Sequence, residues 1–119
     1  MDLFARLKIK AASIDTVVST LSGGNQQKVQ VARWLAAGVT TLLLIDPTRG
    51  VDVGARAEIK RIWAELADAG CAILLVSSDA EELVETCDRV VVMQGGTLAG
   101  DLARVELSEE RLLRLAAGV

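Results

Sequence analysis

Apolar residues recur along the chain in two different spacings. In residues 25–37 and 55–66 they repeat every three or four positions, which predicts helices with one buried face. Continuous apolar runs fill Thr41–Ile45, Cys71–Val76 and Arg89–Met93, and runs this short predict strands covered on both faces, as in a parallel sheet. The order of these elements predicts an α/β fold without internal repeats.

Turn and capping residues set the expected boundaries. Gly38 and Gly70 are placed to end two helices, and Pro47 ends the first strand because it cannot donate to a ladder. Ser78 and Glu81 have the spacing of a capping box, which predicts that Ser78 opens a helix.

The two ends of the chain are patterned differently. Met1–Lys10 is predicted to be the end of a helix, and Ala11–Thr20 to be a connecting segment. Gln94–Gly96 predicts a tight turn that forms a hairpin with Thr97–Gly100, and Ser108 is expected to cap a last helix.

Composition narrows the classes of function. The formal net charge is −3, and no basic excess or basic face indicates a nucleic-acid binder. The chain has no His, and Cys71 and Cys87 form no metal-ligand cluster, so we expect reduced, buried thiols. No apolar run is long enough to cross a bilayer and no signal peptide is visible, so we expect a cytoplasmic protein, docked at the inner face of the cell membrane when assembled.

The segment with the clearest chemistry is Leu21-Ser22-Gly23-Gly24, directly before a helix. Glycines let a ligand approach the backbone, and the free N–H groups of a helix start favour an anion. Taken alone, the segment fits a phosphate cradle or, equally simply, a Gly-rich loop in which Ser22 is an N-cap.

Four stretches together form a family pattern. They are Leu-Ser-Gly-Gly-Asn-Gln-Gln-Lys at 21–28, Asp-Pro-Thr-Arg-Gly-Val-Asp-Val-Gly at 46–54, Leu-Val-Ser-Ser at 75–78 and Cys-Asp-Arg-Val-Val-Val-Met at 87–93. In this order and spacing they resemble the ABC transporter ATPases, most closely the C-terminal cassette of double-cassette ATPases from ribose-, galactose- and xylose-type importers.

The resemblance implies a partial P-loop NTPase domain of the ABC type, with a mostly parallel sheet and a terminal hairpin but without the P-loop strand. We expect a single partial domain: 1–20 end the helical-subdomain connection, 21–38 are the signature loop and helix, and 39–119 run from the Walker B strand to the C-terminal helix.

The resemblance also implies an ATP site shared between two cassettes. The signature residues Ser22, Gly23, Gly24, Asn25 and Gln26 would contact the γ-phosphate of an ATP that, with Mg²⁺, is held by the P-loop of a partner cassette. Gln26 and Lys28 either shape that same surface or form a solvated helix start.

Further positions carry family roles with structural alternatives. Asp46 falls at the catalytic glutamate position and Ile45 at the Mg²⁺ position, so one carboxylate is missing. The alternative for Asp46 is a polar strand end that bonds nearby backbone N–H groups. Asp52 and Arg49 fall at the cassette interface, and their alternatives are an N-cap and a solvated turn residue. Ser78 occupies the switch-His position, where the capping reading is favoured.

No Gly-x-x-x-x-Gly-Lys-Ser/Thr stretch is present, so we expect the chain alone to be inactive. In the family sheet the P-loop strand separates the strands resembling Cys71–Val76 and Arg89–Met93. Its absence predicts an isolated chain that is unstable, oligomeric, or rearranged so that these two strands meet.

The implied partners are the N-terminal cassette or a second ATPase domain, a membrane permease and, indirectly, a periplasmic sugar-binding protein, with no nucleic acid. Two alternatives stay open. One is a non-enzymatic interaction or regulatory module that uses the exposed sheet edge and the loop around Asp52. The other is a fragment of a DNA-repair type ATPase, against which the residues following the signature argue.

Overall fold

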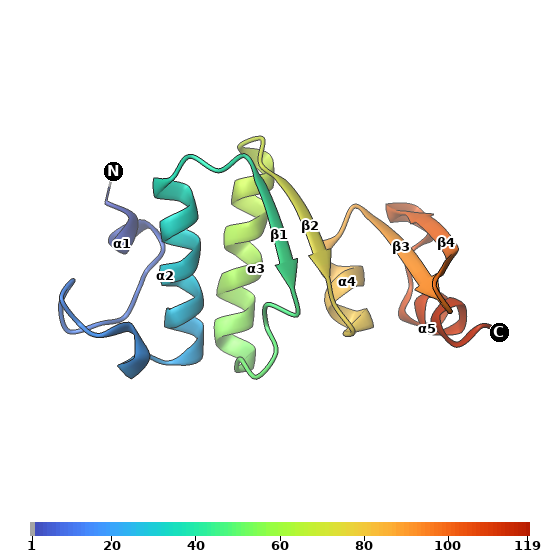
Figure 1. Ribbon diagram of the computed structural model, residues 1–119, viewed down its shortest axis with the longest axis horizontal. Coiled ribbons are helices and arrows are strands. Elements are labelled where there is room, and N and C mark those ends of the chain that lie inside the picture. The colour runs from blue at the N-terminus through green and yellow to red at the C-terminus, as the bar shows by residue number, and fades with distance from the viewer. Residues whose placement is uncertain (1) are drawn as a thin grey trace. The chain divides into compact units, whose positions relative to one another are not determined.

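The computed structural model describes residues 2–119 (Figure 1). The helices are α1 Leu3–Arg6, α2 Gly23–Ala36, α3 Val53–Asp68, α4 Ala80–Thr86 and α5 Glu109–Ala117, with short 3₁₀ turns η1 Val18–Thr20 and η2 Arg104–Glu106. The strands are β1 Thr41–Ile45, β2 Ala72–Val76, β3 Arg89–Gln94 and β4 Thr97–Ala103. This order confirms the predicted alternation of strands and helices.

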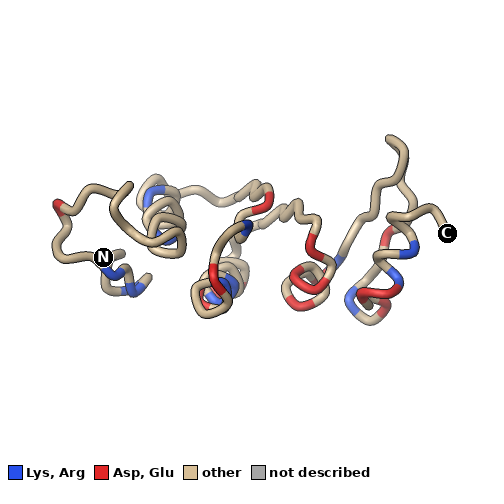
Figure 2. The backbone as a smooth tube through the Cα atoms, turned by 90° about the horizontal axis from the view of Figure 1, so that it is seen from below, with Lys and Arg blue, Asp and Glu red and all other residues tan. Residues whose placement is uncertain are grey.

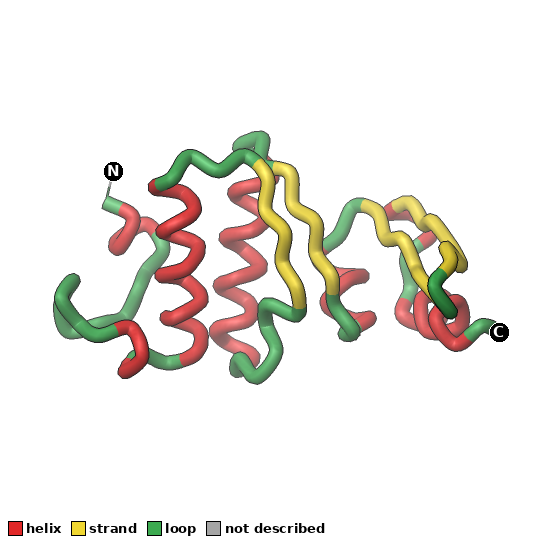
Figure 3. The backbone as a smooth tube through the Cα atoms, in the orientation of Figure 1, coloured by secondary structure: helices red, strands yellow, loops and turns green. Residues whose placement is uncertain are grey.

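The N-terminal segment is mostly loop. Of the predicted helix end, only Leu3–Arg6 is helical, as the short α1, and residues 7–10 are turn and loop; Met1 lies outside the described residues. From Leu7 to Val17 the chain runs as turns and loop before η1, as Figure 3 shows in green, which confirms a connecting segment. Lys28 of α2 holds part of this segment through a hydrogen bond from its Nζ to the Lys8 carbonyl, at 3.2 Å.

The chain divides into two compact units, residues up to Leu74 and residues 75–119, and the division falls inside β2. In the first unit, α3 buries the apolar stripe that its spacing predicted. The stripe consists of Ile59, Ile62, Trp63 and Leu66, so Trp63 is a packing residue. β1 and β2 form a two-stranded sheet, and their arrows point the same way in Figure 1.

The prediction that these strands are covered on both faces is wrong. Leu42 and Leu44 are buried, whereas the alternate side chains are exposed: Leu43 by 60%, Ile45 by 67%, Leu74 by 62% and Val76 by 49%. Side chains alternate between the two faces of a strand, so only one face of this sheet meets a core. The sequence predicted burial correctly for one face of the sheet. The opposite face is apolar but exposed to solvent.

The second unit is built around an antiparallel hairpin of β3 and β4. Gly95 and Gly96 form its two-residue turn with φ of +59° and +80°, a conformation that glycine adopts without steric cost and that suits hairpin turns. The hairpin and α5 share a core of four residues, Val90, Val92, Leu102 and Leu112. Ser108 caps α5 by accepting from the Arg111 amide at 3.2 Å, as predicted.

Among the described residues β2 pairs with β1, and β3 pairs with β4. Charge is mixed rather than gathered into a basic face: α5, for example, carries both signs (Figure 2). Across residues 2–119, none of the helices combines the length and apolar character that a membrane span requires.

The exposed apolar face of β1 and β2 predicts self-association of the purified chain, because apolar surface of this kind is removed from water by contact. Leu43→Thr together with Leu74→Thr should shift the chain toward monomer in analytical ultracentrifugation. Val105→Thr is the matched control, since Val105 is 95% exposed but lies in η2, outside the sheet. Unchanged association in the double variant would contradict this prediction.

Candidate functional site

The signature loop is the end of η1 and the first turn of α2. Ser22 is the N-cap of α2: its Oγ accepts from the Asn25 amide at 3.3 Å and from Asn25 Nδ2 at 2.9 Å. The helix therefore begins at Gly23, two residues before the predicted start at Asn25. The N-cap reading of Ser22 is confirmed, and the side chain stays exposed, so the cap leaves it accessible to a ligand.

The two glycines of the loop have different surroundings. A Cβ on Gly23 would meet nothing within 4 Å, whereas a Cβ on Gly24 would lie 2.5 Å from Cβ of Ala55 in α3. Gly24 is buried and lets α2 and α3 approach closely, whereas Gly23 is exposed. At a helix start the first N–H groups lack intrahelical acceptors, and within residues 2–119 no loop or side-chain oxygen accepts from Gly23 or Gly24.

Asn25 and Gln26 use their side chains within the chain itself. Asn25 Oδ1 accepts from the Lys10 amide at 2.8 Å, and Gln26 Nε2 donates to the Leu21 carbonyl at 2.9 Å. Both residues are half-buried. These contacts shape the loop, and they leave Ser22 and Gly23 as its exposed part.

The sequence alternative that places Lys28 in a solvated helix start is wrong. The side chain is only 3% exposed, and Nζ donates to a carboxylate oxygen of Glu58 in α3 and to the Lys8 carbonyl. Lys28 lowers the pKa of the Glu58 carboxyl, first through this hydrogen bond and then through its charge. Glu58 lies 30 positions later, so no local pattern indicated the pair.

The turn after β1 holds three of the predicted site residues. Asp46 adopts a left-handed φ of +43°, a conformation that Asp tolerates better than most residues, and its carbonyl accepts from the Arg49 amide at 3.2 Å. Arg49 is exposed. Asp52 accepts from the Ala55 amide at 3.0 Å, which confirms it as the N-cap of α3.

The turn is linked to the signature helix. Gln27 of α2 donates from Nε2 to the Pro47 carbonyl, and Arg56 of α3 donates from Nε to the Val51 carbonyl at 3.0 Å. Through these side chains the residues around Asp46 and the loop at Ser22 belong to one hydrogen-bonded assembly within the first unit.

The predicted capping box at Ser78 is wrong. Asp79 is the N-cap of α4, accepting from the Glu82 amide at 3.2 Å, while Ser77 donates from Oγ to the buried Glu82 carboxylate at 2.7 Å. The cap falls on Asp79 because its backbone is extended and its short carboxylate reaches the third amide of the helix. Ser78 itself is exposed, one residue before the cap.

The cysteines and carboxylates form no further chemical centre. Cys71 and Cys87 are free and half-buried, and desolvation is the main reason that the pKa of the Cys87 thiol is raised. In the part of the chain that the structure describes, no three His, Cys, Asp or Glu side chains gather as metal ligands.

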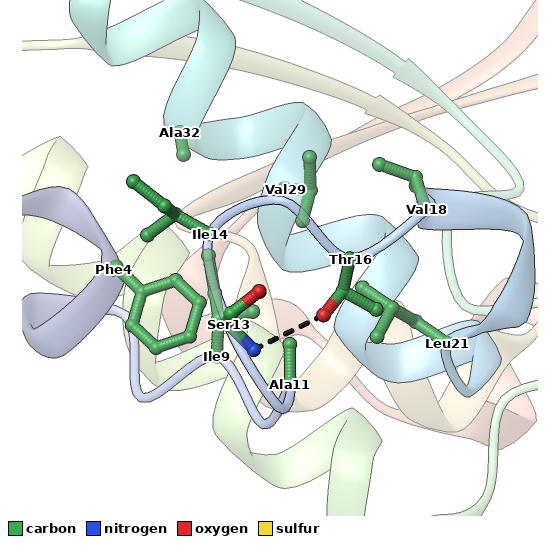
Figure 4. Close-up of a pocket in the computed structure, with 10 residues that line it drawn as sticks. All are labelled: Phe4, Ile9, Ala11, Ser13, Ile14, Thr16, Val18, Leu21, Val29 and Ala32. Atoms are coloured by element: carbon green, nitrogen blue, oxygen red, sulfur yellow. Dashed lines mark hydrogen bonds between the residues drawn. The ribbon is translucent and has the colours of Figure 1, made fainter.

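One pocket was not indicated by the sequence. It has a volume of about 210 Å³ and lies between α1, the following loop and α2 (Figure 4). Its wall is mainly apolar: Phe4, Ile9, Ala11, Ile14, Val18, Leu21, Val29 and Ala32, with Ser13 and Thr16. The Ser13 amide donates to Thr16 Oγ1 at 3.1 Å, so the loop on this side is partly fixed. The loop forms one wall of this pocket, and its path cannot be predicted from the spacing of apolar residues.

The contrast between the two glycines gives a prediction about stability. Gly24→Ala should destabilise the chain by about 1–3 kcal/mol, because the new methyl group overpacks the contact between α2 and α3. Gly23→Ala should leave stability unchanged or raise it by up to about 1 kcal/mol, since Ala is the better helix residue and meets open space. Urea denaturation of the two variants measures the difference, and equal stabilities would contradict the packing role of Gly24.

Comparison with known proteins places this site in context. The chain is 53% identical over 112 residues to the arabinose import ATP-binding protein AraG 2 of Burkholderia thailandensis, covering 94% of this chain and 21% of the relative. It is 48% identical over 118 residues to the ribose import ATP-binding protein RbsA 2 of Rhizobium meliloti, covering 99% and 23%. The chain thus spans about a fifth of the length of these relatives. No protein-family model matches it.

Solved structures show the same fold. An ATP-binding cassette of an ABC transporter, MJ1267 in its ADP conformation, superposes with a TM-score of 0.81 at 22% identity, covering 98% of this chain and 48% of that one. A putative metal-chelate type ABC transporter gives 0.84 at 16% identity, covering 100% and 47%. The chain is therefore homologous to a part of ABC-type sugar import ATP-binding proteins, and it has the fold of part of an ATP-binding cassette.

Proposed function

We propose that the chain supplies the signature loop Ser22–Gly24 to an ATP whose P-loop lies on a partner cassette of a sugar importer. The observation that carries the proposal is the first turn of α2. The amides of Gly23 and Gly24 donate to no intramolecular acceptor in the described chain, and Gly23 is open to close approach. The ligand of this loop would be the γ-phosphate.

The electrostatics of a helix start suit that ligand. Aligned peptide dipoles and free N–H groups place positive charge at the beginning of α2, a helix of 14 residues. Phosphoryl transfer needs such preorganised donors more than it needs covalent chemistry from the protein. Ser22 would add its exposed hydroxyl, whereas Gly24, Asn25 and Gln26 would hold the loop in shape.

The remaining predicted site residues would not contact the γ-phosphate themselves. Asp46 would stand at the catalytic glutamate position of a second, degenerate site, where a single carboxylate cannot both organise Mg²⁺ and orient water. Arg49 and Asp52 are exposed and would face the partner cassette, and the exposed Ser78 would stand at the switch position. ATP and Mg²⁺ would be bound mainly by the partner.

The names of the relatives support a proposal about the wider assembly, because they specify import of arabinose or ribose. The resemblance to ABC importers adds a membrane permease and a substrate-binding protein. We propose the same class of partner here, with the chain at the inner face of the cell membrane.

A non-enzymatic interaction module is the second candidate. The observation that favours it is the exposed apolar face of β1 and β2, with Leu43 and Leu74 each about 60% exposed. Such a module would bind a cassette without changing its turnover.

Mixing the chain with the N-terminal cassette of the Rhizobium ribose import relative separates the two candidates. We expect ATP turnover to rise at least about tenfold, because correctly placed donors stabilise transition-state charge. Ser22→Arg should abolish the rise, since a long side chain fills the phosphate position. Phosphate release is the readout.

The control is Ala67→Arg, which adds the same charge at an exposed position in the last turn of α3. It should stimulate as the unmodified chain does. Binding without stimulation would favour the interaction module, and equal loss in both variants would show a nonspecific effect of charge.

A further inference from the structure

Lys28 is a cation in an unusual place. It is 3% exposed, although it lies one turn into the helix that begins with the signature loop. Its ammonium group donates to Glu58 of α3 and to the Lys8 carbonyl of the N-terminal segment. A buried ammonium is costly unless it is paired, so the position of Lys28 is tied to both partners.

Neighbouring contacts join the same three segments. Gly24 packs against Ala55 of α3, and Asn25 accepts from the Lys10 amide at 2.8 Å. The first two turns of α2 are thus fixed to α3 and to residues 8–10. Because α2 is a continuous helix, the direction of its first N–H groups follows from this attachment.

We propose that Lys28, paired with Glu58, is a positioning residue for the signature loop. The pair fixes the first turn of α2 against α3, so that the amides of Gly23 and Gly24 point in one direction toward an incoming phosphate. This inference rests on the proposed function. It assigns a role to two residues whose side chains do not reach the exposed loop themselves.

The alternative is that the pair contributes only to overall stability. Glu65 provides a matched comparison on the same helix, because it forms an ion pair with Arg61 in which both side chains are 45% exposed. Glu58→Gln and Glu65→Gln make the same chemical change, but only the first leaves a buried cation without its carboxylate.

Hydrogen–deuterium exchange of the chain alone tests the fixing of the first turn. In Glu58→Gln the amides of residues 25–28 should exchange at least about tenfold faster than in Glu65→Gln, while those of β3 and β4 stay unchanged. Lys28→Met should behave as Glu58→Gln does, and Lys28→Arg, which keeps the charge and donors, should restore most of the protection. A uniform rise across α2 and α3, or no change, would overturn the proposal.

Turnover in the mixture with the partner cassette tests the consequence for phosphate. Glu58→Gln should lower the stimulated kcat about five- to tenfold and change KM for ATP less than twofold, because the P-loop of the partner holds the nucleotide. Unchanged kcat despite faster exchange would overturn the role at the phosphate. If the unmodified chain gives no stimulation, the proposed function fails, and the exchange experiment alone decides whether the pair fixes the loop.

Discussion

The close contact between α2 and α3 is the constraint on which the first unit depends. Gly24 allows it, since any Cβ there would lie 2.5 Å from that of Ala55, and Lys28 and Glu58 join the same two helices by charge. Gln27 extends the contact to the turn after β1. The loop at Ser22 and the turn at Asp46 are therefore held by one set of interactions, although 24 positions separate them in the sequence.

This arrangement separates residues that shape the site from residues that would meet a ligand. The side chains of Asn25, Gln26 and Lys28 bond to other parts of the chain, so these residues would act on a ligand only by holding the loop in its geometry. Ser22 and Gly23 are exposed and remain available. A signature motif of this kind combines a small contact surface with a larger supporting structure, because free backbone donors act only where their direction is fixed.

Both sheets leave apolar strand residues exposed. The hairpin of β3 and β4 has its own core with α5, but Val91, Met93 and Leu98 of the hairpin are exposed, and β1 and β2 likewise keep one apolar face exposed. The chain covers about half the length of the solved structures that share its fold. An exposed apolar face on a sheet is a surface that contact with another polypeptide would stabilise.

The sequence by itself determined the order and type of the elements, the hairpin at Gly95–Gly96, and the caps at Ser22, Asp52 and Ser108, because these depend on local spacing and turn chemistry. The motifs at 21–28 and 46–54 also indicated the family. Tertiary structure alone decided the burial of Lys28, the exposure of one face of β1, and the difference between Gly23 and Gly24. Each of these depends on a partner distant in sequence, or on the lack of one, which local patterns cannot specify. The position of the α4 N-cap, at Asp79 and not at Ser78, was likewise known only once the backbone conformation was seen.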